Sequence, residues 1–350
     1  MASTNQSAPS VLIIGQAGDF NLEGFVSNSF RELGWNVQRF NVYQHITDSG
    51  SFNNSLRFLA ARSNEVHKLV DRLWSIQDKI ISAVKKSRPD LLFVFKGELF
   101  PPNVAETIRR DFGARVALWF PDDPRYLHSL LIQIAPSFDH VVVSSRSTVP
   151  ILERKGIRSV IYSPFACDPS IHKSLEQHKT YPVSFVGTYY PDRARLLSKL
   201  IRHNIRIWGP YWRSPWVPKN LRRHVVSSDS YGMNLVNILN RSKITINIHH
   251  KSDLQALGKL NMRIFEATGC GSFLITDAPG GLEEFYAPGR EIACYSTPDD
   301  LVELVDRYLH DDTGRKDIAA AGQERAHRDH TYTKRLQFLL NSTGLRPASV

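Results

Sequence analysis

Cysteine is scarce in this chain, with three residues, Cys167, Cys270 and Cys294, among 350. They are too few and too scattered for a disulfide framework or for the closely spaced ligands of a structural zinc site. The sequence also lacks an apolar run of membrane-spanning length. These absences argue against a disulfide-rich secreted protein, a zinc-finger scaffold and a transmembrane protein.

The first ten residues, MASTNQSAPS, lack the basic and apolar parts of a secretory signal peptide. Together with the few cysteines, this favours the reducing cytoplasm as the location.

Acidic residues are the second deficit: 34 Asp and Glu stand against 44 Lys and Arg, which leaves a net charge of +10.

The positive surplus occurs in short clusters such as Lys85-Lys86-Ser87-Arg88 and Arg222-Arg223-His224, which are interspersed with acids. No helix-turn-helix, zinc-finger or aromatic RNA-binding signature accompanies them. We therefore favour a solvated surface and no nucleic-acid partner, while peripheral contact with an anionic membrane stays open.

What the chain does contain is a series of short apolar runs that alternate with helical stretches. They cover residues 11–15, 37–40, 89–95, 116–120 and 141–145, and then 183–188, 205–208, 244–248 and 273–275. This alternation predicts parallel sheets covered on both faces, and 350 residues suffice for two cores. A long amphipathic region, 56–87, separates the second run from the third. We expect an α/β fold with two Rossmann-like domains facing each other across a cleft.

Polar groups follow two of the first-domain strands at their carboxyl ends, where parallel sheets bind ligands. Lys96 and Glu98 follow one strand, and Asp122 and Asp123 follow the next. Two adjacent carboxylates beside a lysine can serve as a general base. The alternative is structural, with Asp122 capping a turn that Pro124 makes rigid.

The stretch Asn261–Gly289 predicts a charged helix, a short strand and a glycine pair that opens a further helix. Lys259, Arg263 and Glu266 are spaced to form one polar stripe on a helix. Unpaired amides at the helix start after Gly281 suit a diphosphate. A solvated helix face with an Arg263–Glu266 ion pair is the alternative reading.

Two other segments leave alternatives open. The glycine loop after the strand 183–188 suits close approach to phosphates, or it is a plain turn with Arg193 on the surface. The aromatic loop that ends at Trp212 could stack on a base, although we favour packing for Trp208. Adjacent His249 and His250 point to opposite faces of a strand, so a shared metal ion is not expected.

The order and spacing of these motifs resemble the CgeB-type (spore maturation protein-like) glycosyltransferases, which have GT-B architecture and a group 1-like C-terminal domain. The resemblance is carried by Arg241–His249, Asn261-x-Arg263-x-Phe265-Glu266, Gly269-Cys270-Gly271, Gly281–Phe285, Pro288–Ile292, His330–Arg335 and Phe120–Pro124. It implies a hexosyltransferase-like enzyme of glycan biosynthesis (EC 2.4). Such an enzyme moves a sugar from a nucleoside diphosphate sugar to an acceptor hydroxyl and needs no cofactor. We also expect no metal ion, because the sequence places no Asp-x-Asp-type metal ligand for the diphosphate.

The resemblance also assigns roles to residues. It implies catalytic roles for Asp122 and Asp123 and places Lys96 and Glu98 on the acceptor side. The implied donor-binding residues are Gly187, Tyr189, Arg193, Asn247, His249, Asn261, Arg263, Glu266, Gly281, Leu282 and Glu283. Glu266 matches the second of two donor-binding glutamates in related retaining enzymes, and the first position, eight residues earlier, is occupied by Gly258. This departure leaves retaining or inverting stereochemistry open.

By the same resemblance, residues 9–165 form the acceptor-side domain, 166–180 a linker, 181–330 the nucleotide-sugar domain and 331–345 a helix that crosses back. The expected partners are a nucleotide sugar and a glycan, lipid-linked or protein acceptor. Gly258 favours one alternative, a catalytically silent sugar-nucleotide-binding protein. The net charge favours another, a nucleic-acid-binding protein.

Overall fold

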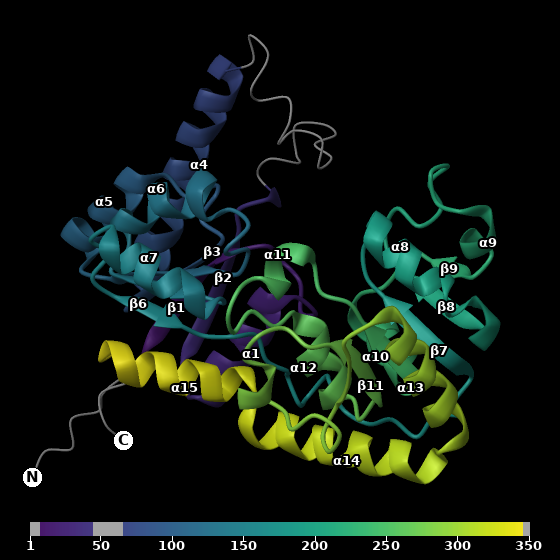
Figure 1. The fold of residues 1–350 in the computed structure, drawn as a ribbon. Coiled ribbons are helices and arrows are strands. Elements are labelled where there is room, and N and C mark those ends of the chain that lie inside the picture. Colours follow the sequence, from purple (N-terminus) through teal and green to yellow (C-terminus); the bar gives the residue numbers. More distant parts are fainter. Residues whose placement is uncertain (1–7, 45–65, 346–350) are drawn as a thin grey trace, which may run out of the picture. The chain divides into compact units, whose positions relative to one another are not determined.

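The computed structural model describes residues 8–44 and 66–345. The chain divides into two compact units, one formed by residues up to Ser163 with those from Leu336 onward, the other by Pro164–Arg335. Each unit contains a six-stranded parallel sheet with helices on both faces (Figure 1). The predicted α/β class with two Rossmann-like domains is therefore confirmed. The first part of the predicted amphipathic region, 56–65, lies outside the described residues.

The sheet of the first unit has the strand order β2-β1-β3-β4-β5-β6. Its central strands are almost wholly apolar because helices cover both of their faces. The strands are β1 (Ser10–Gly15), β2 (Asn36–Asn41), β3 (Leu91–Phe95), β4 (Arg115–Phe120), β5 (His140–Val143) and β6 (Val160–Tyr162). The longer helices are α1 (Leu22–Glu32), α4 (Val66–Ser87), α5 (Pro102–Phe112) and α7 (Val149–Arg154), and a π-helical turn (Leu127–Leu131) precedes α6 (Ile132–Ile134).

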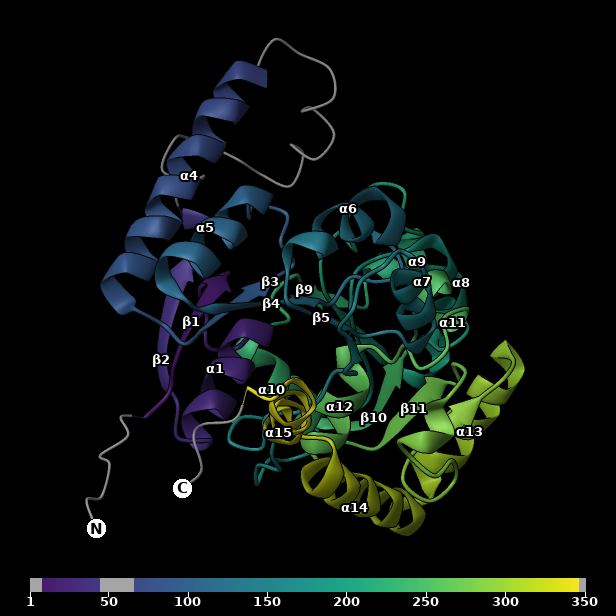
Figure 2. The same ribbon diagram turned by 90° about the vertical axis from the view of Figure 1, so that its left-hand side faces the viewer.

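The two faces of this sheet are covered by different helices, as Figure 2 shows. Helices α4 and α5 pack on the face that carries Leu92 and Val94. Helix α1 covers the opposite face, where Phe30 meets Phe93 with ring centroids 5.5 Å apart. Successive strand residues point to opposite faces, so both layers of the core come from the same apolar runs.

The second unit has the strand order β12-β11-β10-β7-β8-β9. Its strands are β7 (Tyr181–Val186), β8 (Ile205–Trp208), β9 (Val225–Ser227), β10 (Ser242–Asn247), β11 (Leu274–Asp277) and β12 (Ala293–Tyr295). Helices α8 (Pro191–Ser198) and α13 (Pro298–His310) pack on one face, and α10 (Gly232–Asn240) and α12 (Met262–Gly269) on the other. The remaining helices are α9 (Lys219–Arg222), α11 (Lys251–Leu254), α14 (Asp312–Asp329) and α15 (Tyr332–Thr343).

The chain leaves the first unit after Ser163 and rejoins it through α15. This helix begins in the second unit, and its residues from Leu336 onward group with the first unit. Residues 166–180, expected as a linker, group with the second unit. There the Leu175 N–H donates to Asn240 Oδ1 (2.7 Å) and the Gln177 amide donates to Asn237 Oδ1 (2.7 Å). Within the described residues, no helix is both long and apolar enough to cross a bilayer.

Candidate functional site

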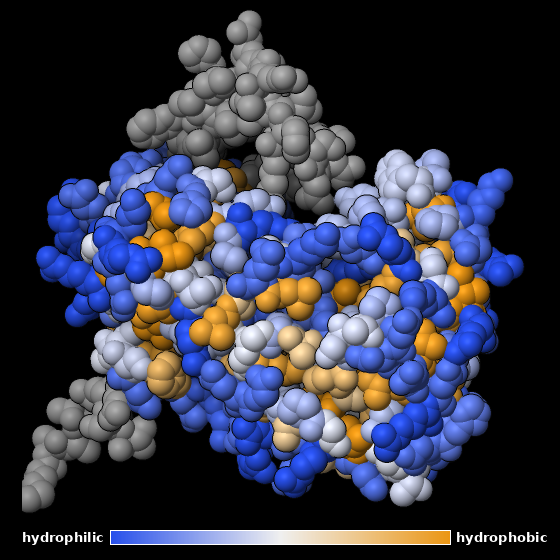
Figure 3. Space-filling model, in the orientation of Figure 1, coloured by the Kyte–Doolittle hydropathy of each residue, from blue (hydrophilic) through white to orange (hydrophobic). Residues whose placement is uncertain are grey.

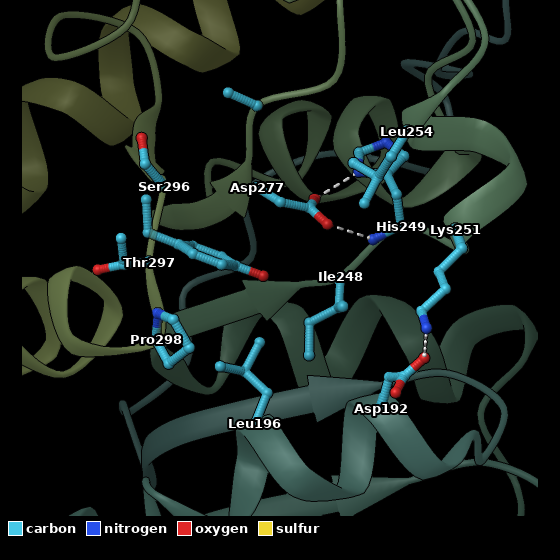
Figure 4. Close-up of a pocket in the computed structure, with 12 residues that line it drawn as sticks. Asp192, Leu196, Ile248, His249, Lys251, Leu254, Asp277, Ser296, Thr297 and Pro298 are labelled. Atoms are coloured by element: carbon cyan, nitrogen blue, oxygen red, sulfur yellow. Dashed lines mark hydrogen bonds and ion pairs between the residues drawn. The ribbon is translucent and has the colours of Figure 1, made fainter.

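A pocket of about 560 Å³ lies in the second unit at the carboxyl ends of β10, β11 and β12 (Figure 4). Strand ends, the start of α8, α11 and the start of α13 supply its lining, which is Asp192, Leu196, Ile248, His249, Lys251, Leu254, Asp277, Ala278, Tyr295, Ser296, Thr297 and Pro298. Thr297 also fixes the start of α13, because its hydroxyl accepts the Asp300 N–H (3.1 Å) while Asp300 accepts the Thr297 N–H (3.0 Å). Three neighbouring strands and a capped helix thus shape the pocket.

One wall of the pocket is a buried hydrogen-bonded pair, His249 and Asp277. The carboxylate accepts the His249 backbone N–H (2.9 Å) and lies 2.5 Å from Nδ1. His249 Nε2 accepts the backbone N–H of Asn261 (3.2 Å), so the ring proton is on Nδ1. The pair therefore joins the ends of β10 and β11 to the start of α12, and His249, with a wholly buried side chain, acts as a positioning residue.

Side-chain amides extend this network. Asn261 Nδ2 donates to Asn247 Oδ1 (3.0 Å), and Asn247 Nδ2 donates to Thr276 Oγ1 (2.9 Å). Asn261 Oδ1 is buried and has no hydrogen-bond partner among the described residues. The structure thus brings together Asn247, His249 and Asn261, three of the residues that we predicted to bind the donor. It leaves the Asn261 Oδ1 acceptor open at the start of α12.

We predicted that Lys259, Arg263 and Glu266 form one polar stripe on a helix, and this prediction is wrong for Lys259. Helix α12 begins at Met262 with Asn261 as its N-cap, so Lys259 precedes the helix and cannot share its face. Instead, Lys259 is buried, and its ammonium lies 5.0 Å from the centre of the Phe165 ring. The reason is that residues 255–260 form turns after α11 rather than a first helical turn.

Arg263 and Glu266 do share the helix face, but they are not solvated. Arg263 Nη1 donates to Glu266 Oε2 (2.6 Å), and their side chains are only 16% and 8% exposed. The other carboxylate oxygen, Oε1, lies 4.0 Å from His172 Nε2. His172 Nδ1 accepts the Asp168 N–H (3.0 Å), and burial lowers the pKa of the imidazole, so a neutral N–H faces Glu266.

The helix predicted after Gly281 is a single 3₁₀ turn, Leu282–Glu284, in which Leu282 is buried and Glu283 exposed. The glycine loop therefore does not lead into the start of an α-helix. The loop instead packs closely on Gly258, whose N–H donates to Gly280 O (2.9 Å). A Cβ on Gly281 would lie 3.4 Å from Gly258 Cα, and Gly258 has φ +71°. A glutamate at position 258 would therefore be strained.

The second glycine loop, after β7, is held by Arg193. This side chain is partly buried and donates to Thr188 O (2.9 Å) and Ile248 O (2.6 Å), so the alternative that places it on the surface does not hold. Gly187 O accepts the indole N–H of Trp212 (2.7 Å), and Tyr189 packs edge-on against the same indole. Arg193 thus ties the end of β7 to the end of β10, beside the pocket.

The first unit separates the two predicted catalytic carboxylates. Asp123 is 1% exposed and accepts three hydrogen bonds, from Ser144 N (2.9 Å), Ser144 Oγ (2.7 Å) and Ser145 N (2.8 Å). Asp122 keeps 39% of its side chain exposed, with Lys96 Nζ 3.8 Å away. Glu98 accepts a hydrogen bond from the Tyr43 hydroxyl (2.8 Å). Only Asp122 of the pair is therefore presented to a ligand.

Sequence reasoning missed Asp277, His172 and most of the pocket lining. Asp277 ends a strand that neighbours β10, so the rule that parallel strands share a carboxyl edge could have found it. His172 gave no signal, because it meets Glu266 only through the tertiary fold. Among the described residues, no three His, Cys, Asp or Glu side chains gather so as to hold a metal ion.

Residues 193–341 match the sequence model of a family described as glycosyl transferase-like. The matched region contains α12 and nearly all of the pocket lining. The match supports the glycosyltransferase family broadly and does not single out the CgeB type. No curated protein matches the sequence.

Solved structures similar to the chain include sucrose-phosphate synthase from Thermosynechococcus elongatus (TM-score 0.65, 13% identity, covering 96% of this chain and 99% of that one). Anabaena HepE in complex with UDP-glucose has TM-score 0.63 and 12% identity, covering 96% of this chain and 100% of that one. A Staphylococcus aureus TarM variant in complex with fondaparinux, α-GlcNAc-glycerol and UDP has TM-score 0.53 and 13% identity, covering 78% and 59%. At these identities the likeness shows the fold, which is GT-B.

Proposed function

We propose that this protein transfers a sugar from a nucleoside diphosphate sugar to an acceptor hydroxyl. The observation that carries the proposal is the coincidence of the family match with the pocket and α12 in the second unit. The pocket volume of about 560 Å³ lies within the range of small-molecule sites, roughly 300–1,000 Å³.

The pocket lining fits a nucleoside. Leu196, Ile248, Leu254 and Tyr295 offer apolar and aromatic surface to a base, while Ser296 and Asp277 offer polar atoms beside it. HepE, which shares the fold, is in complex with UDP-glucose. This makes UDP and UDP-glucose the first compounds to test.

The diphosphate is proposed to bind at the start of α12. Amides of a first helical turn lack intrahelical partners and carry positive potential, and Arg263 adds a cation. As the bond between the sugar's anomeric carbon and the diphosphate oxygen breaks, its electron pair goes to the diphosphate. These groups would stabilise that charge without a metal ion. Activity that survives EDTA is expected, and loss reversed by magnesium or manganese would overturn this route.

On the acceptor side, Asp122 is the proposed base. If the reaction inverts, the acceptor oxygen bonds to the anomeric carbon while its proton passes to Asp122. If the reaction retains, Asp122 orients the acceptor hydroxyl. The acceptor is expected to be a glycan, a lipid-linked sugar or a protein.

A pocket-filling substitution tests the donor site. Ser296→Trp places a large ring in the pocket from an exposed position, and Ser228→Trp is the matched control at another exposed serine. Thermal shift with uridine, thymidine, guanosine and cytidine diphosphates should show one nucleotide that stabilises the wild type and Ser228→Trp but not Ser296→Trp. Equal stabilisation of all three proteins would place the nucleotide elsewhere.

A catalytically silent binding protein is the second candidate, because Gly258 replaces a donor-contacting glutamate. The two candidates differ in one measurement. Hydrolysis or transfer of a donor that binds, above the background without protein, indicates an enzyme, and binding without turnover indicates the silent protein. A nucleic-acid-binding protein would instead show DNA or RNA binding that weakens steeply as salt rises.

A further inference from the structure

The positive charge of this protein is concentrated in one segment of the second unit. Residues 193–228 contain nine Lys and Arg and no Asp or Glu. Three of the nine pair with acids outside the segment, through Arg195–Asp192, Lys199–Asp299 and Arg202–Asp306. A fourth, Arg193, is partly buried and binds backbone carbonyls. The other five have no acidic partner among the described residues: Arg206, Arg213, Lys219, Arg222 and Arg223. These five therefore present uncompensated charge.

Large apolar and aromatic side chains are exposed in the same region. Tyr211, Trp216 and Tyr231 are 58%, 67% and 71% exposed, and Val226 and Met233 about 40%. By contrast, Trp208 and Trp212, in the same stretch, are buried. Proteins rarely expose large groups of apolar side chains, and such groups often mark interaction sites.

The topology brings these side chains to one edge of the sheet. Tyr211 and Trp216 lie in the loop that follows β8, and Tyr231 lies just after β9. These neighbouring parallel strands end at the same sheet edge, where the Gly209 N–H donates to Ser227 O (3.0 Å). Arg213 Nη2 also donates to Val226 O (2.8 Å), which fastens the loop to β9.

The loop stands at the outer side of the second unit. Figure 1 shows it next to α9 and β9, and β9 is the last strand of the sheet. In Figure 3 the surface over α8 and α9 shows blue, pale and orange residues side by side. Three prolines, at 210, 215 and 218, restrict the loop backbone around Trp216.

We propose that this edge docks on a bilayer that contains anionic lipid. The docking edge comprises Tyr211, Trp216, Val226, Tyr231 and Met233, and the five uncompensated cations flank it along β8, the loop after β8 and α9. Tryptophan and tyrosine favour the headgroup layer, where the ring is in apolar surroundings and the polar atom stays hydrated. Lysine and arginine add attraction to anionic headgroups.

The aliphatic members of the docking edge decide between a membrane and RNA. Single-stranded RNA is bound by stacking of bases on aromatic rings, which an exposed valine and methionine do not supply. Acyl chains near the headgroups accept such side chains readily. The edge is separated from β10, at the proposed donor pocket, by two strands and hence by about 15 Å. This inference goes beyond sugar transfer and holds whether or not the protein transfers sugars.

Vesicle flotation tests the docking edge with the full chain. We expect binding to phosphatidylcholine vesicles that contain phosphatidylglycerol, and little binding to pure phosphatidylcholine. Trp216→Ala with Tyr231→Ala should weaken binding at least tenfold. Phe20→Ala, which removes an exposed aromatic beside Asp19, should leave it unchanged.

A charge-reversal pair separates a local site from net charge. Lys219→Glu with Arg223→Glu should weaken binding about tenfold or more, since each cation near an anionic surface contributes measurably. Lys85→Glu with Lys86→Glu changes the net charge equally, at the end of α4, and should have a small effect. Equal losses in both double variants would overturn the docking edge.

Trp216 also provides a spectroscopic readout. Of the five tryptophans whose side chains the structure describes, the other four are no more than 5% exposed. Brominated lipids should therefore quench fluorescence of the wild type and quench Trp216→Phe much less. Absence of quenching would refute the proposal. It would also be refuted if the protein bound a single-stranded RNA oligonucleotide tightly instead of vesicles, and the aromatic variants lost that RNA binding.

Discussion

At the scale of single residues, neighbours in sequence have opposite environments. Asp122 and Asp123 follow the same strand, yet one is exposed beside Lys96 and the other is buried under three hydrogen bonds. Adjacent side chains leave the backbone in different directions, so one faces solvent and the other faces the β5 loop. Their substitutions should therefore have different consequences.

Asp122→Asn should lower turnover by about 100-fold or more if Asp122 is the base, because general base catalysis contributes at least that much. The free energy of unfolding should stay within about 0.5 kcal/mol of wild type, as for an exposed position. Asp123→Ala should instead destabilise the fold by roughly 3 kcal/mol, because it leaves buried donors unpaired. Denaturant unfolding and initial rates check both, and Asp122→Asn with wild-type turnover would remove Asp122 from the chemistry.

The Arg263–Glu266 pair gives a second residue-scale prediction. Because both side chains are largely buried, Glu266→Ala should destabilise the second unit by roughly 3 kcal/mol as well as weaken nucleotide binding. Glu266→Gln keeps a hydrogen-bond acceptor for Arg263 and should recover much of the stability. If Glu266 binds ribose, donor affinity should remain at least tenfold weaker in Glu266→Gln, which isothermal titration measures. Wild-type affinity in Glu266→Gln would show that the residue is structural.

At the scale of elements, the His249–Asp277 pair holds α12 to the ends of two strands. Asp277→Asn should lower the free energy of unfolding by roughly 3 kcal/mol, since it replaces a buried carboxylate that accepts two hydrogen bonds. It should also shift donor KM more than kcat, because the start of α12 moves. Asp299→Asn, which breaks an exposed ion pair, is the control and should cost less than about 1 kcal/mol.

The motif His330–Arg335 fastens α15 to the connector. His330 donates from Nε2 to Phe285 O (2.8 Å), while Arg335 donates to Pro164 O (3.2 Å). Burial, helped by nearby Arg335, lowers the pKa of His330 to about 4. The family-like motif thus has a structural role in this chain.

The lowered pKa of His330 predicts acid sensitivity. The unfolded chain takes up this proton near the ordinary pKa of about 6.5, whereas the folded protein resists it until about pH 4. The stabilisation is therefore complete above 6.5 and is lost as pH falls through this window. Between about pH 7 and pH 5 the loss from this group is roughly 2 kcal/mol. Urea unfolding of His330→Gln should show a correspondingly smaller loss than wild type, while the exposed control His310→Gln should match wild type.

At the scale of the whole molecule, two separate cores predict two unfolding events. Each unit has its own sheet and apolar cluster, so calorimetry should resolve two transitions or one broadened transition. A nucleotide that binds the pocket should raise only the transition of the second unit. Ser296→Trp should abolish that shift and leave the other transition in place. A nucleotide that shifts both transitions equally in Ser296→Trp would contradict a site in the second unit.

The sequence by itself determined the fold class and the positions of most strands along the chain. Apolar runs such as Val11–Gly15 and Val116–Phe120 are long enough to be buried on both faces, and only a parallel, helix-covered sheet provides that environment. The strand-end rule also located Asp122, Asn247 and His249. These inferences depend on local periodicity, which the chain carries along its length.

Only the tertiary structure decided what each polar residue does. Lys259 lies outside α12, because His249 binds the Asn261 N–H and the helix begins only at Met262. Gly281 opens one 3₁₀ turn, in a loop that packs on Gly258. Gly258 is explained by its contact with the glycine loop, and the buried state of Glu266 by His172 and Arg263. These contacts join residues far apart in sequence, and their burial and hydrogen bonds follow from packing that periodicity does not encode.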